Sequence, residues 1–202
     1  MKKVRSALAA ALLTGSLLVS SAGAAPLSHT VAAGDTMWKL AVKYQVGTSE
    51  IIAANPQVSN PNLIYPGQIL QIPQQDSSVA AYEAEVIRLV NDIRQDYGLQ
   101  PLTANWELSR VARYKSQDML SRGYFSHTSP TYGSPFQMIK AFGLSFRTAG
   151  ENIAKGYSTP EAVVNGWMNS SGHRANILNS AYTQIGVGYV AQGNYWTQMF
   201  IG

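Results

Sequence analysis

A short polar stretch, QQDSSVA at residues 74–80, most constrains how this chain can fold. It is rich in small and polar residues, and the hydrophobic pattern differs on its two sides, which is typical of a linker between modules. The chain has no cysteine, so each module must be held together by packing rather than by disulfides. We therefore predict two domains, residues 28–73 and 81–202, joined by a linker at 74–80.

The first 25 residues, MKKVRSALAAALLTGSLLVSSAGAA, predict a secretory signal peptide. A basic head precedes an apolar run rich in small residues, and AGA at 22–24 suits cleavage. That run is shorter than the ~20 residues of a membrane span. Its removal takes away three basic residues, so the formal net charge falls from +4 to +1 (4 − 3). We expect an extracellular or cell-wall-associated protein with no membrane span, and no nucleic-acid partner because no basic patch remains.

The region 28–73 has the pattern of a small β-α-α-β unit. HTV favours a strand, and Asp35 or Thr36 can cap the helix TMWKLAVKY. Thr48 or Ser49 can cap the helix SEIIAAN, which NP ends. The turn YPGQ then leads into the alternating strand ILQIP. A unit this small buries little core, as is common in binding modules.

Three segments of this unit, HTVAAGDTMWKLAVKY, NP and IYPGQILQIP, together resemble a LysM domain over residues 29–73. The resemblance implies binding of N-acetylglucosamine-containing glycans, chiefly peptidoglycan or chitin, in a groove between two loops. Carried over to this chain, the groove walls are Gly34, Asp35, Thr36 and Met37 on one side and Asn62, Leu63, Ile64 and Tyr65 on the other. Two alternatives stay open, because Asp35 and Thr36 could act only as helix caps, and Met37 and Ile64 could belong to a minor core.

The region 81–202 is long enough for a full core. Helical spacing of apolar residues predicts helices within 81–98, 102–123, 134–143 and 158–170. Alternation then predicts a strand pair within 183–202, joined by the turn AQGN. Helices followed by strands indicate an α+β fold in which helices cover an antiparallel sheet.

Three polar motifs in this region carry candidate site residues. His127 lies in YFSHTSP, Glu151 in GENIA and His173 in SSGHRANIL, each on a different predicted element. If they meet, two imidazoles and a carboxylate suit a divalent cation such as Zn²⁺, or general acid–base chemistry. The alternatives are a structural loop histidine, a Glu151 that pairs with Arg174 or accepts backbone amides, and a His173 that caps a helix.

The segments YFSHTSP, AGENIA, VVNGWMNSSGHRANILNSAYTQIGVGYV and YWTQMF resemble the bacterial branch of the CAP superfamily over about residues 84–202. That superfamily comprises cysteine-rich secretory proteins, antigen 5 and pathogenesis-related 1 proteins. The resemblance implies an α-β-α sandwich whose broad cleft holds two histidines and acidic residues, with a divalent cation in some members. Residue by residue it assigns His127, Glu151 and His173 to that cleft.

The chain departs from the better-known eukaryotic pattern in two places. Those members often have a second glutamate a few residues after the tryptophan that matches Trp167, where this chain has Ser170. In addition, HRANILNSA separates His173 from YTQ, whereas their second histidine directly precedes it. A three-ligand site keeps an open coordination position, but usually binds a cation more weakly than a four-ligand site.

Three hypotheses for function follow. The first is a secreted bacterial wall-associated protein: the LysM module binds peptidoglycan, and the CAP module presents a cleft for an unknown ligand, with or without Zn²⁺. The second is a hydrolase of a wall polymer or peptide that uses Glu151, His127 and His173, although no GxSxG or HExxH nucleophile or metal motif occurs. The third is an assembly protein of a spore coat or envelope layer.

Overall fold

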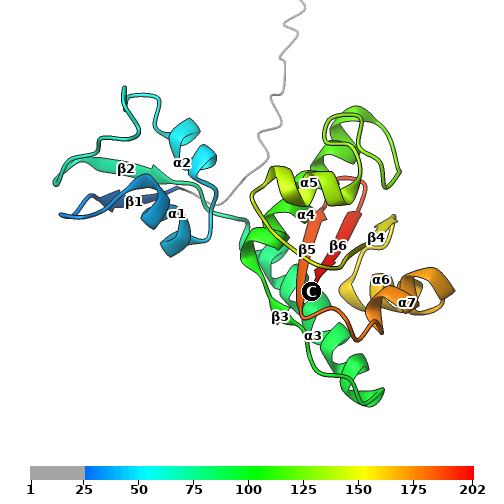
Figure 1. Cartoon of the computed structure of the whole chain (residues 1–202). Coiled ribbons are helices and arrows are strands. Elements are labelled where there is room, and N and C mark those ends of the chain that lie inside the picture. The colour runs from blue at the N-terminus through cyan, green and yellow to red at the C-terminus, as the bar shows by residue number, and fades with distance from the viewer. Residues whose placement is uncertain (1–25) are drawn as a thin grey trace, which may run out of the picture.

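The computed structural model describes residues 26–202, which form two units joined by a short segment (Figure 1). The predicted signal peptide lies outside these residues. Within 26–202, no helix combines the length and hydrophobicity needed to cross a membrane.

The first unit has the predicted β-α-α-β order, with β1 (Leu27–Thr30), α1 (Met37–Tyr44), α2 (Thr48–Ala54) and β2 (Ile69–Ile72). The two strands are antiparallel, and Leu27 lies opposite Ile72. The Thr36 side chain caps α1 by accepting a hydrogen bond from the backbone N–H of Lys39. The cap of α2 differs from the prediction: Gly47 occupies it, and the helix begins at Thr48 itself.

The core of this unit comes from both helices and β2. Leu40, Ile51, Leu70 and Ile72 are fully buried. Trp38 on α1 is 67% exposed and does not join them. A large aromatic side chain therefore lies on the surface of a very small domain.

The second unit contains a four-stranded sheet in the order β3-β5-β6-β4. Its strands are β3 (Thr103–Ala104), β4 (Ala149–Lys155), β5 (Gln184–Val190) and β6 (Tyr195–Ile201). Its helices are α3 (Ser77–Asp96), α4 (Trp106–Arg122), α5 (Pro135–Ala141), α6 (Pro160–Met168) and α7 (Ser171–Ile177). The pairings are antiparallel except that between β3 and β5.

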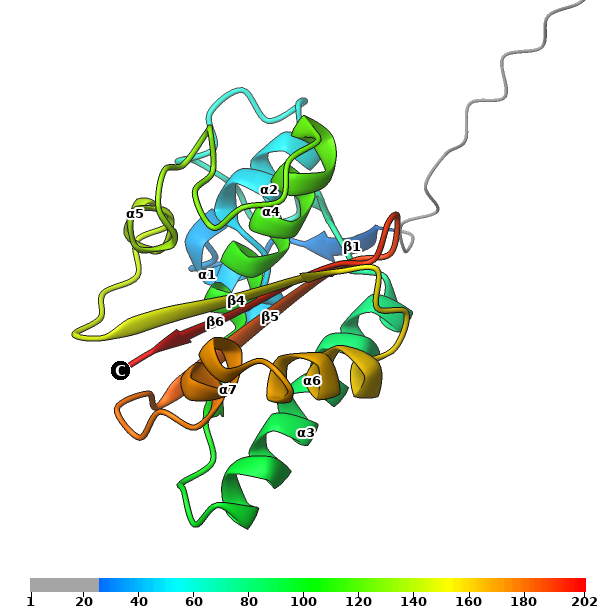
Figure 2. The same cartoon turned by 90° about the vertical axis from the view of Figure 1, so that its right-hand side faces the viewer.

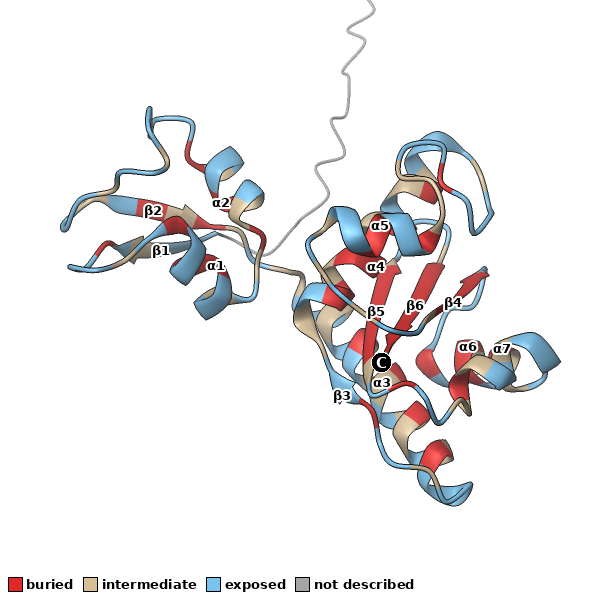
Figure 3. Cartoon of the chain, viewed as in Figure 1, coloured by how far each residue is buried: buried red, intermediate tan, exposed pale blue. Residues whose placement is uncertain are grey.

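Helices cover both faces of this sheet. In Figure 2, α4 and α5 lie above the strands and α3, α6 and α7 lie below them. Side-chain alternation explains the two layers: Trp196 and Phe200 of β6 pack with α3 and α6, while Met199 and Ile201 pack with α4 and α5. Every residue of β6 is buried (Figure 3). The α-β-α sandwich and the α+β class are therefore confirmed.

Three elements differ from the prediction. Strand β3 occupies the start of the region 102–123 that was predicted as a helix, and α4 begins after it at Trp106. Strand β4 was not predicted, because its sequence AGENIAK is short and polar for a buried strand. Helix α3 begins at Ser77, inside the predicted linker, because the Asp76 side chain accepts hydrogen bonds from the N–H groups of Ser78 and Val79. The segment without regular structure between the units is thus only 73–76.

Helix α4 lies unusually close to β5 because two glycines of β5 face it. A Cβ atom at Gly188 would lie 2.1 Å from the backbone nitrogen of Arg113, and one at Gly186 would lie 2.3 Å from the backbone carbon of Leu108. This close packing positions the far end of α4 beside β4, where the candidate site is found.

Candidate functional site

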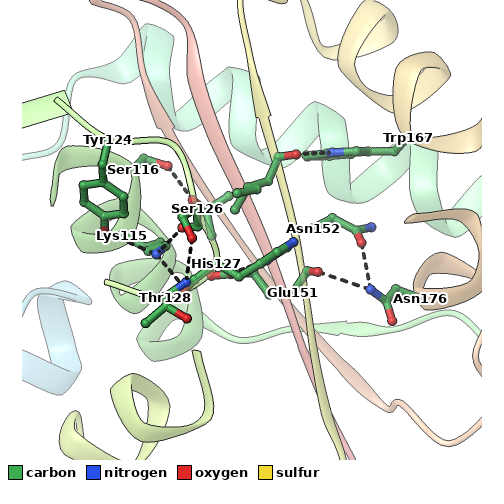
Figure 4. Close-up of polar contacts among 12 residues, drawn as sticks. Lys115, Ser116, Tyr124, Ser126, His127, Thr128, Glu151, Asn152, Trp167 and Asn176 are labelled. Carbon is green, nitrogen blue, oxygen red and sulfur yellow. Dashed lines mark hydrogen bonds and ion pairs between the residues drawn. The ribbon is translucent and has the colours of Figure 1, made fainter. Parts of the chain in front are cut away.

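Glu151 and His127 form the centre of the candidate site in the second unit. Glu151 lies on β4, with its side chain on the face of the sheet that α4 covers, and His127 lies in the loop between α4 and α5. His127 Nδ1 and Glu151 Oε1 are 2.7 Å apart (Figure 4). The carboxylate is 1% exposed and the imidazole 52% exposed, so a buried acid contacts an imidazole that solvent can reach.

The charge state of Glu151 is set by its burial. Desolvation raises the pKa of this carboxyl, while the hydrogen bond from His127 and the charge of Lys115 oppose the increase. Its second oxygen, Oε2, is buried and has no hydrogen-bond partner among the described residues. A buried polar atom without a partner is costly and uncommon, and such atoms gather at functional sites. This oxygen is therefore the position at which the carboxyl can carry a proton.

Lys115 of α4 holds the loop that carries His127. Its Nζ donates to the carbonyl oxygens of Ser126 at 2.7 Å and His127 at 2.8 Å, and to the Tyr124 hydroxyl at 3.2 Å (Figure 4). The side chain is buried, and desolvation lowers its pKa against the attraction of Glu151 and Asp118. Lys115 therefore fixes the backbone from which the imidazole projects.

Asp118, one helical turn further along α4, fixes the remainder of the loop. It accepts hydrogen bonds from the hydroxyls of Tyr124 at 2.6 Å, Ser129 at 2.7 Å and Thr131 at 3.0 Å. Sequence reasoning missed both Lys115 and Asp118. The available signal was their position, because Lys115 lies among the buried residues Val111, Ala112 and Met119 at helical spacing, where a charge needs a partner.

His173 lies on α7, on the opposite face of the sheet from α4. Its backbone carbonyl accepts from Asn152 Nδ2 at 3.1 Å, and Asn152 also accepts from Asn176 Nδ2 at 2.8 Å. Neighbouring residues of a strand point to opposite faces, so Asn152 connects to α7 while Glu151 connects to His127. Burial, and then the charge of His127, lower the pKa of His173. His173 is thus electrostatically coupled to the site but makes no hydrogen bond to Glu151 in the described chain.

Within residues 26–202, no group of three histidine, cysteine, aspartate or glutamate side chains is arranged to hold a metal ion. One imidazole nitrogen of His127 is already engaged by Glu151. The structure brings together the pair His127 and Glu151, which suits proton exchange or ligand binding.

The first unit has a groove at the predicted glycan site, with a volume of about 470 Å³. Six of the eight predicted residues line it: Asp35, Thr36, Met37, Asn62, Leu63 and Ile64. Trp38, Thr48 and Pro61 complete the lining. Sequence reasoning missed these three additional residues.

The other two predicted glycan residues lie outside the lining of this groove. Gly34 adopts a positive φ of 86°, and its carbonyl accepts from Lys39 Nζ. Tyr65 is exposed to solvent. Among the six that line the groove, Asp35 accepts hydrogen bonds from the Ala32 N–H and from His29, and these lower its pKa. Asp35 therefore stabilises the turn at one wall.

Two family models match the chain. The model described as the cysteine-rich secretory protein family (CAP) matches residues 87–200, and the LysM domain model matches residues 29–73. The two matched regions coincide with the two structural units.

The chain is also similar to curated relatives and to a solved structure. The uncharacterized protein YkwD of Bacillus subtilis (strain 168) is 63% identical over 126 residues, which are 62% of this chain and 49% of YkwD. The uncharacterized membrane protein YlbC of the same organism is 43% identical over 119 residues, 59% of this chain and 34% of YlbC. The chain thus spans half or less of the length of these relatives. The crystal structure of an extracellular protein containing an SCP domain from Bacillus anthracis str. Ames has a TM-score of 0.59 at 34% identity, covering 67% of this chain and 47% of that one.

Proposed function

Because the chain belongs to the cysteine-rich secretory protein (CAP) family and carries a LysM domain, we propose that it is a secreted protein of the bacterial cell wall. In this proposal the LysM domain binds N-acetylglucosamine-containing glycan, chiefly peptidoglycan. The CAP domain then presents the site around Glu151 and His127 near the wall. A single small binding module holds its target reversibly, so its effect is to raise the local concentration of the CAP site.

The observation that carries this proposal is the groove of the LysM domain. Its two walls come from separate loops, and it combines apolar side chains such as Leu63 with polar ones such as Thr36 and Asn62. Apolar surface with a few polar groups is what a ligand site usually offers. The methyl group of an N-acetyl sugar can contact the apolar side chains, and its amide and hydroxyl groups can form hydrogen bonds with the polar ones.

Binding to the wall can be tested by sedimentation with purified peptidoglycan. The double variant Asn62→Ala, Leu63→Ala removes two exposed side chains from one wall, so the domain should still fold. We expect it to pellet at least about fivefold less than the unchanged chain, equivalent to roughly 1 kcal/mol. Ile69→Ala is the matched control, because Ile69 is equally exposed but lies outside the groove. Equal pelleting of all three chains would contradict the proposal.

A second candidate function is hydrolysis of a wall polymer or a peptide, and the Glu151–His127 pair favours it. A buried carboxyl whose pKa is raised can exchange a proton with a half-exposed imidazole, as general acid–base catalysis requires. The test is incubation of the chain with wall material or peptides. Product formation that disappears in Glu151→Gln supports hydrolysis, while no turnover under any condition leaves ligand binding as the role of the pair.

Zinc binding by His127, Glu151 and His173 is a separate prediction of the family resemblance. It can be tested by titrating Zn²⁺ into the chain while following the ring proton signals of His127 and His173 by NMR. If one ion binds both residues, both signals change together and saturate at one equivalent. Unchanged His173 signals would exclude the three-ligand site.

A further inference from the structure

The LysM and CAP domains are joined by a specific polar contact as well as by the chain. Arg110 of α4 donates to Glu50 of α2 at 2.8 Å and to the Ser49 hydroxyl at 3.0 Å. The Tyr114 hydroxyl donates to the same carboxylate at 2.5 Å. A Cβ atom at Gly47 would lie within 2.3 Å of the ends of the Glu50 and Arg110 side chains, so a larger residue here would have to displace this ion pair. The two domains therefore have a defined relative orientation.

A second groove, of about 330 Å³, runs along this junction. The LysM domain lines one side of it with residues of α1 and the start of α2, including Trp38 and Thr48. The CAP domain lines the other side with Trp106, Glu107 and Arg110 of α4, and with Phe142. Trp38 and Thr48 also line the glycan groove of the LysM domain. The two grooves thus share these two lining residues and lie next to each other on the LysM domain.

The tryptophans of the chain are divided between core and groove. Of the four, Trp167 and Trp196 are fully buried in the CAP core. Trp38 is largely exposed, and Trp106 is half-buried at the first turn of α4. Both of the accessible tryptophans line the junction groove. Exposed aromatic surface is costly in water and is enriched at binding sites.

The lining of the junction groove carries few charges. Arg110 is neutralised by Glu50, which leaves Glu107 as the other charged side chain of the groove lining. The remaining polar groups are hydroxyls such as those of Thr48 and Ser49. Aromatic faces combined with neutral polar groups suit the flat apolar faces and hydroxyl edges of sugar rings.

We propose that the CAP domain supplies the second half of the glycan site. A glycan bound in the LysM groove continues past Trp38 into the junction groove, where further sugar units lie against Trp106. The inference rests on the proposed glycan binding by the LysM domain. It adds that the chain prefers long N-acetylglucosamine polymers to short ones, because only a long polymer reaches both domains.

The test compares N-acetylglucosamine oligomers of four and eight units, titrated calorimetrically into the chain lacking residues 1–25. Trp106→Ala should weaken binding of the eight-unit oligomer about tenfold, the upper value for one aromatic contact, and leave the four-unit oligomer unchanged. A longer oligomer also binds more tightly because it can occupy one site in several registers. Trp106→Ala does not change this statistical effect, so the effect cannot explain a selective loss of affinity for the eight-unit oligomer. Tyr97→Ala is the control, because Tyr97 is an exposed aromatic residue outside the groove.

A fluorescence measurement covers the case in which Trp106→Ala impairs folding. Trp38→Phe keeps an aromatic ring at this position and leaves Trp106 as the one tryptophan that is not fully buried. The eight-unit oligomer should change the emission of this variant, and the four-unit oligomer should not.

Three outcomes separate the inference from the function on which it rests. Calorimetric binding of the eight-unit oligomer without any change in Trp106 emission overturns the inference alone. Equal weakening of both oligomers by Trp106→Ala, in a folded variant, overturns it too. Failure of the unchanged chain to bind either oligomer contradicts glycan binding itself.

Discussion

At the scale of single residues, the CAP site contains a buried carboxylate, Glu151, and a buried ammonium, Lys115. Each neutralises the charge of the other only in part. Glu151 contacts His127 through one oxygen and leaves the other without a partner. The Lys115 ammonium donates hydrogen bonds to backbone carbonyl oxygens of the loop rather than to the Glu151 carboxylate. The site therefore keeps an incompletely satisfied acid, which a fold optimised only for stability would avoid.

We predict that Glu151→Gln removes part of the pH dependence of stability. Because the folded-state pKa of Glu151 is raised above its usual 4.5, the folded chain binds this proton more tightly than the unfolded chain. Its contribution to stability is therefore complete below pH 4.5 and is lost as pH rises through the folded-state pKa. The stability of the unchanged chain minus that of Glu151→Gln should decrease over this window.

The measurement is urea unfolding at a series of pH values, followed by the emission of the buried Trp167 and Trp196 in the CAP core. His173 acts in the opposite direction. Its pKa is lowered from 6.5, so its contribution is present above pH 6.5 and is lost as pH falls. Both chains contain His173, so this effect cancels in the difference. A difference that does not vary with pH would contradict the assignment.

Lys115→Met should loosen the loop that carries His127. The substitution keeps most of the side-chain volume but removes two partly buried hydrogen bonds to the carbonyl oxygens of the loop, which costs about 2 kcal/mol of unfolding free energy. Amide hydrogen exchange in residues 126–129 should become faster. Lys140→Met is the matched control, because Lys140 is exposed on α5. Unchanged exchange in the loop would show that Lys115 does not hold it.

At the scale of elements, the contact between α4 and β5 determines where the site lies. Gly186 and Gly188 allow the helix to approach the strand so closely that any side chain there would meet the helix backbone. The same helix carries Lys115 and Asp118, which hold the His127 loop, and Arg110, which contacts the LysM domain. A displacement of α4 would therefore disturb both sites.

Two glycine substitutions should have opposite effects for this reason. Gly188→Ala forces a methyl group against the α4 backbone and should cost about 3 kcal/mol of stability. Gly172→Ala in α7 meets no atom within 4 Å and should stabilise the chain by about 0.5 kcal/mol through reduced unfolded-state entropy. Thermal unfolding of both variants checks the pair. Equal effects would show that α4 does not pack on β5 as described.

At the scale of the whole molecule, the junction determines whether the two domains act together. Arg110 and Glu50 are partly buried, with side chains 20% and 26% exposed, and Arg110 also stacks on the rings of Tyr114 and Phe142. Burial and the contact with Glu50 raise the pKa of Tyr114 to about 12. These contacts restrict the motion that a four-residue connection would otherwise permit.

A double-mutant cycle measures this restriction. We expect Arg110→Gln and Glu50→Gln to show a coupling energy of about 1 kcal/mol, as found for residues in direct contact. Either substitution should also increase the radius of gyration measured by small-angle X-ray scattering. A coupling energy of zero with an unchanged radius would mean that the junction is not held by this ion pair.

The sequence by itself determined the two domains, their α+β architecture and most of their elements. These features follow from local patterns: periodic apolar residues, caps such as Thr36 and stops such as Gly123. Strand β4 was missed, because its polar sequence becomes a strand at the edge of the sheet only when it pairs with β6 and the covering helices bury it.

The tertiary structure alone decided which of the candidate residues meet. It joined His127 to Glu151, placed His173 on the other side of β4, and revealed that Lys115 holds the loop. It also placed Trp38 and Trp106 along one groove between the domains. Residues far apart in sequence are brought together by strand alternation and helix packing, and these depend on contacts that local patterns do not encode.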